Sequence, residues 1–269
     1  MTAGVLDVRD VAVWYGGVHA VDGVSFEVPA GEVLGLIGPN GSGKTTLLDA
    51  IGGQVRCTRG AVALDGLDLV DHFPEDRAAL GLVRSFQDCR LFPELTVTEV
   101  LLVSEDARRR AGVLATTFHL PWARRAERAK RAAVAEVVDA FGLARFRNHR
   151  VAELSTGTRR VVDLASIVLA EPRVLLLDEP TAGIAQREAE AFAPLLQRIH
   201  TVTGATIVLV EHDVPLVFSL CTRIVVMEAG KVVSAGTPDV VRAEPAAVAA
   251  YLGASPEALA RSGRLADES

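Results

Sequence analysis

The chain has 269 residues, of which 49% are apolar and 23% charged, a composition typical of a folded globular protein that excludes an intrinsically disordered one. Its formal net charge of −6 disfavours nucleic acid as the main partner, although a local basic patch can override net charge. The mean hydropathy is high, at +0.29, but every apolar run is far shorter than the ~18–20 residues of a membrane-spanning helix, so we expect none.

The cysteines and the N-terminal residues bear on the compartment. Cys57, Cys89 and Cys221 lie far apart and match neither a disulfide framework nor a metal-ligand pattern. The first residues lack the basic segment followed by an apolar one that is typical of a signal peptide. Both observations predict a protein of a reducing compartment.

Strand and helix patterns alternate along the first fifty residues. The segment Val5–Val13 alternates in polarity and predicts a strand. We expect one side of this strand to carry Val5, Asp7, Arg9, Val11 and Val13. Ser25–Val28 predicts a second strand, the apolar run Val33–Ile37 predicts a buried one, and Thr45–Ile51 is compatible with a helix. This order is typical of an α/β protein.

A glycine-rich loop, named the P-loop below, lies between the buried strand and that helix. It reads Gly38, Pro39, Asn40, Gly41, Ser42, Gly43, Lys44, Thr45, Thr46 and fits the pattern GxxxxGK[ST]. Glycines let successive N–H groups face a phosphate, and the helix N-terminus adds positive potential. We expect Lys44 to reach the β- and γ-phosphates and the Thr45 hydroxyl to ligate Mg²⁺. The loop therefore predicts a nucleoside triphosphate site.

The middle of the chain, from about Val97 to Leu169, reads as helical without a convincing strand. Pro121 is a suitable start for a helix that runs to about residue 141. Its predicted apolar stripe consists of Ala126, Ala129, Ala133, Val137 and Phe141. Its first half is basic, with Arg124, Arg125, Arg128, Lys130 and Arg131. These charges predict a solvated helix face, and the alternative is a patch near anionic lipid or a partner.

An acidic pair follows a second buried strand. The run Val174–Leu177 ends in Asp178 and Glu179. In P-loop enzymes an acid at the end of such a strand completes the Mg²⁺ shell, and we assign this role to Asp178. Glu179 is placed to polarise the attacking water as general base. The alternative, a helix cap or a loop carboxylate, is plausible for either acid alone but weaker for two together.

The C-terminal third continues the α/β pattern. A helix is predicted from about Gln186 to Thr203, followed by the buried strand Thr206–Val210. Ile224–Met227 and Lys231–Val233, with a turn at residues 228–230, predict a hairpin. Together with the family resemblance given next, these elements predict a P-loop NTPase core of mainly parallel sheet with an antiparallel β subdomain, into which an α-helical subdomain is inserted.

With these residues the chain resembles the ATP-binding subunits of ABC transporters over nearly its whole length. The segment Leu154–Arg160 stands where that family has a signature helix that usually reads LSGGQ. The resemblance implies that Ser155, Thr156 and Gly157 contact the γ-phosphate of ATP bound by the opposite subunit. Thr156 and Thr158 depart from the usual Gly and Gln. Read without the resemblance, this segment is a helix capped by a serine.

Three weaker matches agree with the same family. The resemblance implies that Gln87 senses Mg²⁺ and links the nucleotide site to the helical region. It implies that His212, after a buried strand, hydrogen-bonds the γ-phosphate, the alternative being a histidine with a local partner. It implies that Tyr15 stacks on adenine, the alternative being a half-buried strand aromatic. One departure is Ala185, which stands where the family usually has an aspartate that reaches across a dimer.

The resemblance is closest to the ATP-binding subunits of branched-chain amino acid importers. It rests on the segment Arg84–Val97, on a long helical insertion over about 104–150, and on the C-terminal segments Gly236–Pro238 and Val248–Gly253. It implies one ABC ATP-binding domain over residues 1–253, with a helical subdomain at about 88–169, a C-terminal extension at about 236–253 and a tail at 254–269.

The resemblance also implies ATP and Mg²⁺ as cofactors and a second ATPase subunit, identical or not, as partner. Transmembrane permease subunits would hold the chain at the cytoplasmic face of the membrane, with a solute-binding protein as a further component and no nucleic acid. Because the solute is open, a lipid or lipopolysaccharide export ATPase remains an alternative. A non-transport ABC ATPase and a degenerate regulatory ATPase are the others.

Overall fold

The computed structural model describes residues 2–85, 91–109, 121–184 and 192–252, with side chains for all of these except 107–109, 121–124 and 252. The chain divides into two compact units. Residues 4–74 and 206–269 form the first, which contains the P-loop and is named the P-loop unit. Residues 1–3 and 75–205 form the second, named the helical unit. The residues of the predicted nucleotide site are therefore distributed over both units.

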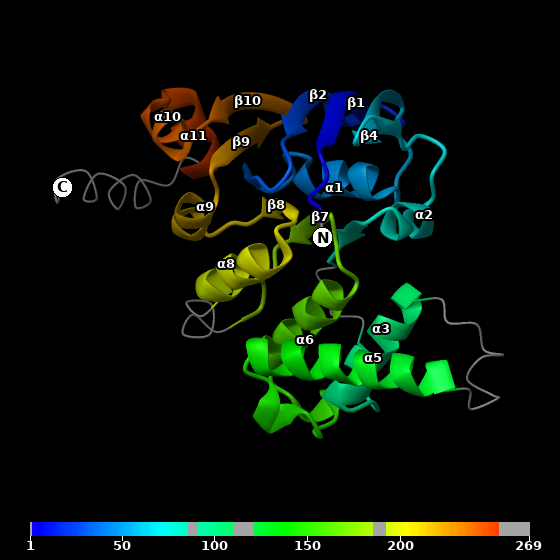
Figure 1. Ribbon diagram of the computed structural model, residues 1–269. Coiled ribbons are helices and arrows are strands. Elements are labelled where there is room, and N and C mark those ends of the chain that lie inside the picture. The colour runs from blue at the N-terminus through cyan, green and yellow to red at the C-terminus, as the bar shows by residue number, and fades with distance from the viewer. Residues whose placement is uncertain (1, 86–90, 110–120, 185–191, 253–269) are drawn as a thin grey trace. The chain divides into compact units, whose positions relative to one another are not determined.

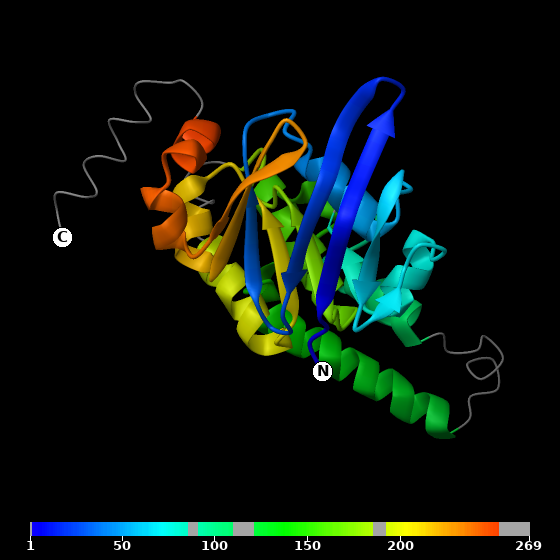
Figure 2. The same cartoon turned by 90° about the horizontal axis from the view of Figure 1, so that it is seen from above.

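Four strands of the P-loop unit form an antiparallel sheet in the order β2-β1-β4-β5. Their bounds are β1 Leu6–Tyr15, β2 Val18–Val28, β4 Arg59–Leu64 and β5 Leu67–Asp68. β1 and β2 form the long hairpin of Figure 2, and helix α1, Lys44–Gly52, packs against it. The two strands predicted in this region are confirmed, and both are longer than predicted.

The prediction that the odd-numbered residues from Val5 to Val13 all share one side of this strand is wrong. The alternation holds in the first half of β1, where Leu6 and Val8 are buried and Arg9 is exposed. Asp10 then adopts a positive φ of 47°, and the pairing with β2 shifts between Val8 and Val11. This β-bulge moves the strand's phase by one residue, so that Val11 and Val13 lie on the buried side and not on the side of Asp7 and Arg9.

Four further strands of the P-loop unit follow one another in space in the order β10-β9-β3-β8. Their bounds are β3 Val33–Ile37, β8 Thr206–Val210, β9 Arg223–Glu228 and β10 Lys231–Gly236. β3 runs parallel to both neighbours, and every residue of β3 and β8 is buried, which confirms both predicted buried strands. The predicted hairpin is confirmed as β9 and β10, joined at Ala229 and Gly230 with positive φ.

Three short helices complete the P-loop unit: α9 Val214–Leu220, α10 Pro238–Ala243 and α11 Pro245–Leu252. α9 packs against β3, and α11 packs against β9 and β10. Phe218 of α9 meets Tyr251 edge to face at 6.0 Å between ring centroids, and the Arg242 guanidinium lies over the Phe218 ring at 4.6 Å. The described part of the predicted C-terminal extension is thus mainly helical and is attached through aromatic contacts.

The helical unit has one parallel strand pair, β6 Leu82–Arg84 with β7 Val174–Asp178. Its helices are α2 Pro74–Ala79, α3 Val97–Arg109, α5 Pro121–Ala140, α6 Thr156–Leu169 and α8 Phe192–Thr203, with short 3-10 turns at Ala144–Phe146 and Val151–Glu153. α3, α5 and α6 pack on one another (Figure 1) around a common apolar core. Between residues 97 and 169 the described part contains no strand, in agreement with the sequence prediction.

The apolar stripe predicted for α5 is wrong in position. Lys130, Val134 and Val138, four residues apart, are the buried side chains of this helix. Ala126 and Ala129, predicted to face the core, are exposed. The other predicted members, Ala133, Val137 and Phe141, are only partly buried against the core. The larger valines fill the space between helices that alanines would leave as voids.

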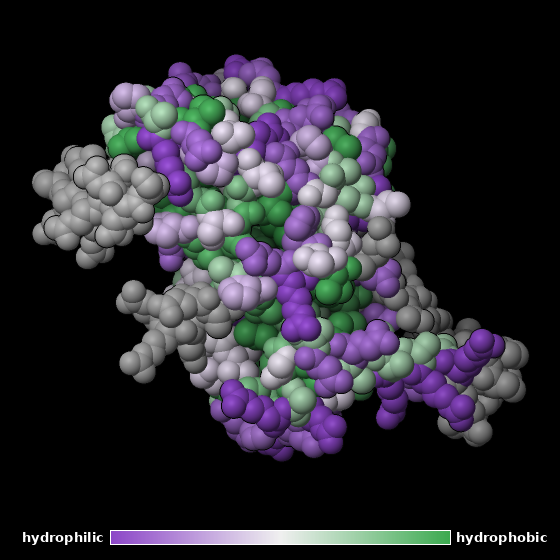
Figure 3. Space-filling view, turned by 60° about the vertical axis from the view of Figure 1, so that its left-hand side comes forward, coloured by the Kyte–Doolittle hydropathy of each residue, from purple (hydrophilic) through white to green (hydrophobic). Residues whose placement is uncertain are grey.

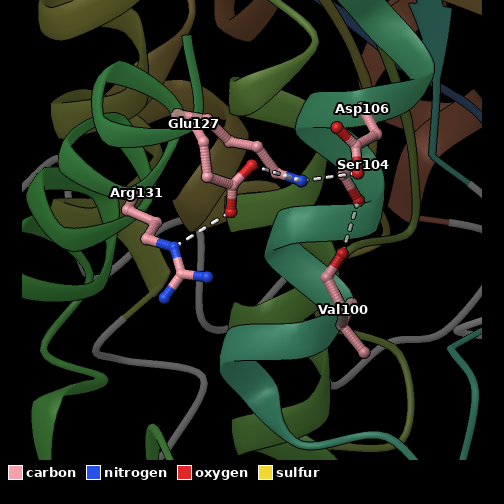
Figure 4. A network of polar contacts seen from close by, with 6 residues as sticks. Val100, Ser104, Asp106, Glu127 and Arg131 are labelled. Carbon is pink, nitrogen blue, oxygen red and sulfur yellow. Dashed lines mark hydrogen bonds and ion pairs between the residues drawn. The ribbon is translucent and has the colours of Figure 1, made fainter. Parts of the chain in front are cut away.

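Two of the five basic residues predicted on α5 form the ion pairs drawn in Figure 4. Lys130 Nζ lies 2.5 Å from Asp106 Oδ2 of α3, and its side chain is 11% exposed. Arg131 Nε lies 2.9 Å from Glu127 Oε1 one turn earlier on α5. In the face that Figure 3 shows, hydrophilic residues gather at the lower left and at the lower right. The exposed Arg125, Arg128 and Arg131 agree with the predicted solvated helix face, whereas the buried Lys130 does not.

The architecture confirms the predicted fold class. Parallel strands form the core, an antiparallel sheet stands beside them, and a helical part follows the P-loop in the chain. Within the described ranges, no helix combines the length and the apolar character needed to cross a membrane. The exact bounds of the domain, the helical insertion and the tail remain predictions.

Candidate nucleotide-binding and hydrolysis site

The P-loop joins the fully buried strand β3 to helix α1 through glycines in conformations that other residues rarely adopt. Gly38, Gly41 and Gly43 have φ values of 150°, 78° and 98°. Gly43 is the N-cap of α1, so the loop leads directly into the free N–H groups of the helix. This is the strand–loop–helix context that gives the motif its meaning.

The backbone around the loop explains two of these glycines. A Cβ atom on Gly38 would lie 2.1 Å from the carbonyl oxygen of Met227, and one on Gly43 would lie 2.2 Å from that of Ala20. A Cβ on Gly41 would meet nothing within 4 Å. Thus β2 and β9 support the loop at both ends, while its middle faces open space.

Lys44 is the charged group of this loop, and its side chain is folded back over it. Its Nζ donates hydrogen bonds to the carbonyl oxygens of Gly38 and Pro39, both at 2.9 Å. The Lys44 residue is 5% exposed, so its ammonium group lies within the loop and not in bulk solvent. Thr45, next to it, is exposed, and Thr46 is partly buried.

Two further predicted residues lie in the same unit. β8 pairs with β3 in parallel, with Val210 opposite Leu36, so His212 and the P-loop leave the strands at the same edge. His212 is exposed, and the next residue, Asp213, caps α9 by accepting from the Leu216 N–H at 3.1 Å. Tyr15 ends β1 and is 53% exposed, so its ring is accessible for stacking.

In the helical unit, Asp178 is the last residue of β7 and is 1% exposed. Its Oδ2 accepts a hydrogen bond from Arg84 Nη2 at 2.8 Å, within an ion pair whose side chains are 2% and 6% exposed. Its backbone N–H donates to Ser85 Oγ at 3.3 Å. The predicted metal ligand is therefore fixed at both its main chain and its side chain by the end of β6.

Glu179 is partly buried and its backbone is strained. Its φ of 47° is in the left-handed region, although the residue precedes Pro180, a position that favours extended backbone. Its carbonyl oxygen accepts from the Ala182 N–H at 3.0 Å and from Arg160 Nη2 at 3.4 Å. A strained residue held by surrounding contacts is common at functional sites.

The segment that resembles the signature begins α6, and its serine caps the helix as the sequence predicts. Ser155 Oγ accepts from the Thr158 N–H at 3.2 Å and lies 3.0 Å from the Thr158 hydroxyl. Ser155 and Thr156 are exposed, whereas Gly157 is buried. Arg160, one turn later, reaches the carbonyl group of Glu179 and so connects this helix with the acidic strand.

The sequence analysis missed two arginines that contact the acidic pair. Arg84 was only part of a matching segment, and Arg160 only part of the signature segment. Arg84 becomes a neighbour of Asp178 only through the pairing of β6 with β7, which no pattern in the sequence records. Two predicted positions, Gln87 and Ala185, lie outside the described residues.

The fold and the P-loop define the chain as a P-loop nucleotide-binding protein with an inserted helical part. Residues 21–182 match the profile of the ABC transporter family of ATP-binding domains, and the chain belongs to this family. It is thus an ABC-type ATPase that binds ATP.

Several members of this family are similar to the chain over nearly its whole length. The chain is 35% identical to the high-affinity branched-chain amino acid transport ATP-binding protein BraF of Pseudomonas aeruginosa, over 94% of this chain and 99% of the relative. It is 34% identical, with the same coverage, to the protein LivG of Escherichia coli that carries the same description. A crystal structure of a nucleotide-free ATP-binding cassette from an ABC transporter has a TM-score of 0.78, with 28% identity over 93% of this chain and 99% of that one. ATP-binding proteins named for the import of sn-glycerol-3-phosphate and Fe(3+) ions also match.

Proposed function

We propose that this ATPase energises the uptake of branched-chain amino acids or closely related small solutes. The observation that carries the proposal is the 34–35% identity to BraF and LivG, which spans 94% of this chain and 99% of those proteins. Relatives that match over nearly their full length are better guides to the solute than the glycerol-phosphate relative, of which the chain covers 63%. The chain's own part in this function is the binding and hydrolysis of ATP.

The P-loop would hold the phosphates of ATP. Its N–H groups and the N-terminus of α1 supply partial positive charge, and Lys44 supplies a full charge once its ammonium turns from the loop carbonyls to the phosphates. All nine residues 38–46 belong to this cradle. Tyr15 is the proposed adenine platform, and His212 the proposed hydrogen-bond donor to the γ-phosphate. The shared edge of β3 and β8 supports the role of His212.

The oxygen donors proposed for a metal fit Mg²⁺. Thr45 offers a hydroxyl, Asp178 a carboxylate, and Gln87 an amide oxygen, and Mg²⁺ is usually held by one or two carboxylates together with substrate phosphates. In the described part of the chain, no three His, Cys, Asp or Glu side chains gather to hold a metal by themselves. A bound Mg²⁺ would neutralise charge on the β- and γ-phosphates. Glu179 would take the proton from the attacking water as general base.

The partners follow from the same proposal. Ser155, Thr156 and Gly157 lie at the start of α6, and two of these residues are exposed, as required to meet ATP held by a second ATPase subunit. Permease subunits would supply the membrane passage and hold this chain at the cytoplasmic face, and a solute-binding protein would deliver the solute. Lipid export and non-transport roles have less support, because the full-length relatives are named for amino acid transport.

The solute assignment is tested by uptake in the source cells. We expect that Lys44→Ala and Glu179→Gln in the chromosomal copy each reduce uptake of radiolabelled leucine, isoleucine and valine at least tenfold. Uptake of glycerol-3-phosphate in the same cells is the matched control and should stay at the wild-type rate. Unchanged branched-chain uptake in both variants would overturn the solute assignment while leaving the ATPase assignment intact.

A further inference from the structure

Arg84 forms a buried ion pair with the residue proposed to hold Mg²⁺. Its Nη2 lies 2.8 Å from Asp178 Oδ2, and the two side chains are 6% and 2% exposed. The pairing of β6 with β7 places Arg84 opposite Leu176. Asp178 is two residues further along β7 and therefore on the same face as Leu176. The Arg84 side chain thus reaches diagonally from the end of β6 to the carboxylate at the end of β7.

This geometry constrains the Asp178 side chain strongly. The arginine side chain is always charged, and a buried carboxylate without a partner would strongly destabilise the fold. The two groups therefore stay paired. The Ser85 hydroxyl, next in the chain, holds the Asp178 N–H. The last residue of β6 therefore orients the Asp178 carboxylate, and the residue that follows β6 fixes its backbone.

We propose that Arg84 is a positioning residue that orients Asp178 and thereby raises the affinity of the site for its divalent cation. The inference rests on the proposed role of Asp178 in holding Mg²⁺. Groups that hydrogen-bond a metal-binding carboxylate generally orient the ligand, and their removal typically weakens metal binding by about 10- to 100-fold. The opposite relation is a distinct physical alternative, in which the guanidinium competes with the cation for the carboxylate and its removal tightens binding.

The test is a titration of the full chain with Mn²⁺ in the presence of saturating ADP, in which the EPR signal of the free ion reports unbound Mn²⁺. A protein-free titration corrects for Mn²⁺ bound by ADP in solution. We expect Arg84→Gln to weaken Mn²⁺ binding at least tenfold and Arg84→Lys to restore part of the loss, because lysine keeps the charge without the planar fork. Binding of fluorescent ADP in EDTA should be the same in all variants, since that measurement involves no metal.

Arg223→Gln is the matched control. Arg223 also forms a partly buried ion pair, with Glu32 at 2.9 Å from both Nε and Nη2. Arg223 begins β9, and Glu32 directly precedes β3, so the pair lies at the edge opposite to the P-loop. Loss of this pair should lower stability without changing Mn²⁺ affinity, which separates a metal effect from a general effect on the fold.

The outcomes are distinguishable. Asp178→Asn should weaken Mn²⁺ binding more than Arg84→Gln, and adding Arg84→Gln to it should cause no further loss. If Asp178→Asn leaves Mn²⁺ binding unchanged, the proposed metal role of Asp178 is wrong, and this inference falls with it. If Asp178→Asn weakens binding but Arg84→Gln leaves it unchanged or tightens it, only the positioning role of Arg84 is overturned. If Arg84→Gln does not fold, the Arg84→Lys variant must still bind Mn²⁺ more weakly than the wild type for the proposal to stand.

Discussion

Two charged residues of the helical unit, Arg160 and Asp163, are largely buried, and burial changes the pKa of Asp163. Arg160 is 3% exposed and contacts both the carbonyl of Glu179 and, at 4.0 Å, the carboxylate of Asp163. Burial raises the pKa of the Asp163 carboxyl from 3.8 to about 6, opposed by the nearby Arg160 charge. Asp163 Oδ2 is buried and accepts no hydrogen bond from the described residues. Such a carboxylate costs stability whenever it is ionised.

The pH dependence of stability follows from this raised pKa. Between pH 4 and 6 the unfolded state has already lost the Asp163 proton that the folded state keeps, so this residue's contribution to stability falls as the pH rises through that range. The difference between 3.8 and about 6 corresponds to at most about 3 kcal/mol. We expect Asp163→Asn to raise the free energy of unfolding by about 1–3 kcal/mol at pH 8, and by much less at pH 4.5.

Urea unfolding of the two proteins at both pH values, followed by circular dichroism, measures this difference. Asp139→Asn is the control, because that carboxylate is exposed on α5. An Asp163→Asn variant that is less stable than the wild type at pH 8 would contradict the argument, since it would mean that the charged form stabilises the fold.

At the scale of elements, a periodic pattern predicts a helix more securely than it predicts the buried face of that helix. The sequence places a helix at residues 121–141, close to the observed Pro121–Ala140. The observed core face is Lys130, Val134 and Val138, and the lysine is buried because Asp106 of α3 accepts its charge. A basic residue in a core stripe cannot be recognised from α5 alone. Likewise, the bulge at Asp10 changes the face of β1 through contacts with neighbouring strands.

The corrected face of α5 predicts different effects for two similar substitutions. Val134→Ala removes buried methyl groups from the core and should lower the free energy of unfolding by about 1–3 kcal/mol. Ala129→Ser, on the face first predicted to be buried, should change it by less than about 0.5 kcal/mol, because Ala129 is exposed. Equal losses of stability for the two substitutions in urea unfolding would contradict the observed core face of α5.

At the scale of the whole molecule, the proposed site draws on both units. Tyr15, the P-loop and His212 belong to the P-loop unit, whereas Ser155 and the acidic pair belong to the helical unit. The proposed second subunit would supply the signature helix that meets the ATP held by this chain.

This arrangement predicts a separation of binding from turnover in Glu179→Gln. Removing the proposed base while keeping the charges around the phosphates should leave ATP binding near wild type and slow hydrolysis at least 100-fold. The bound ATP, which is not hydrolysed, should then hold the Glu179→Gln protein as a dimer in size-exclusion chromatography with ATP. Lys44→Ala weakens phosphate binding, so this variant should remain monomeric. Wild-type turnover in Glu179→Gln would remove Glu179 from the catalytic role.

The sequence by itself determined the parts whose chemistry is local. The P-loop, the strand and helix that flank it, and the serine cap of α6 are encoded within short segments, because backbone geometry and hydrogen bonding there involve residues a few positions apart. The match to ABC transporters rests on the spacing of such segments, and the comparison with known proteins confirmed it.

Only the tertiary structure decided which charged side chains meet. The Arg84–Asp178 pair joins residues 94 positions apart, and the Lys130–Asp106 pair joins two helices. Both pairs form because packing brings distant elements together, and no periodic pattern records which strand ends or helices become neighbours. The sequence thus determined where a nucleotide is expected to bind, whereas the packing of β6 on β7 decided which residue holds the proposed metal ligand in place.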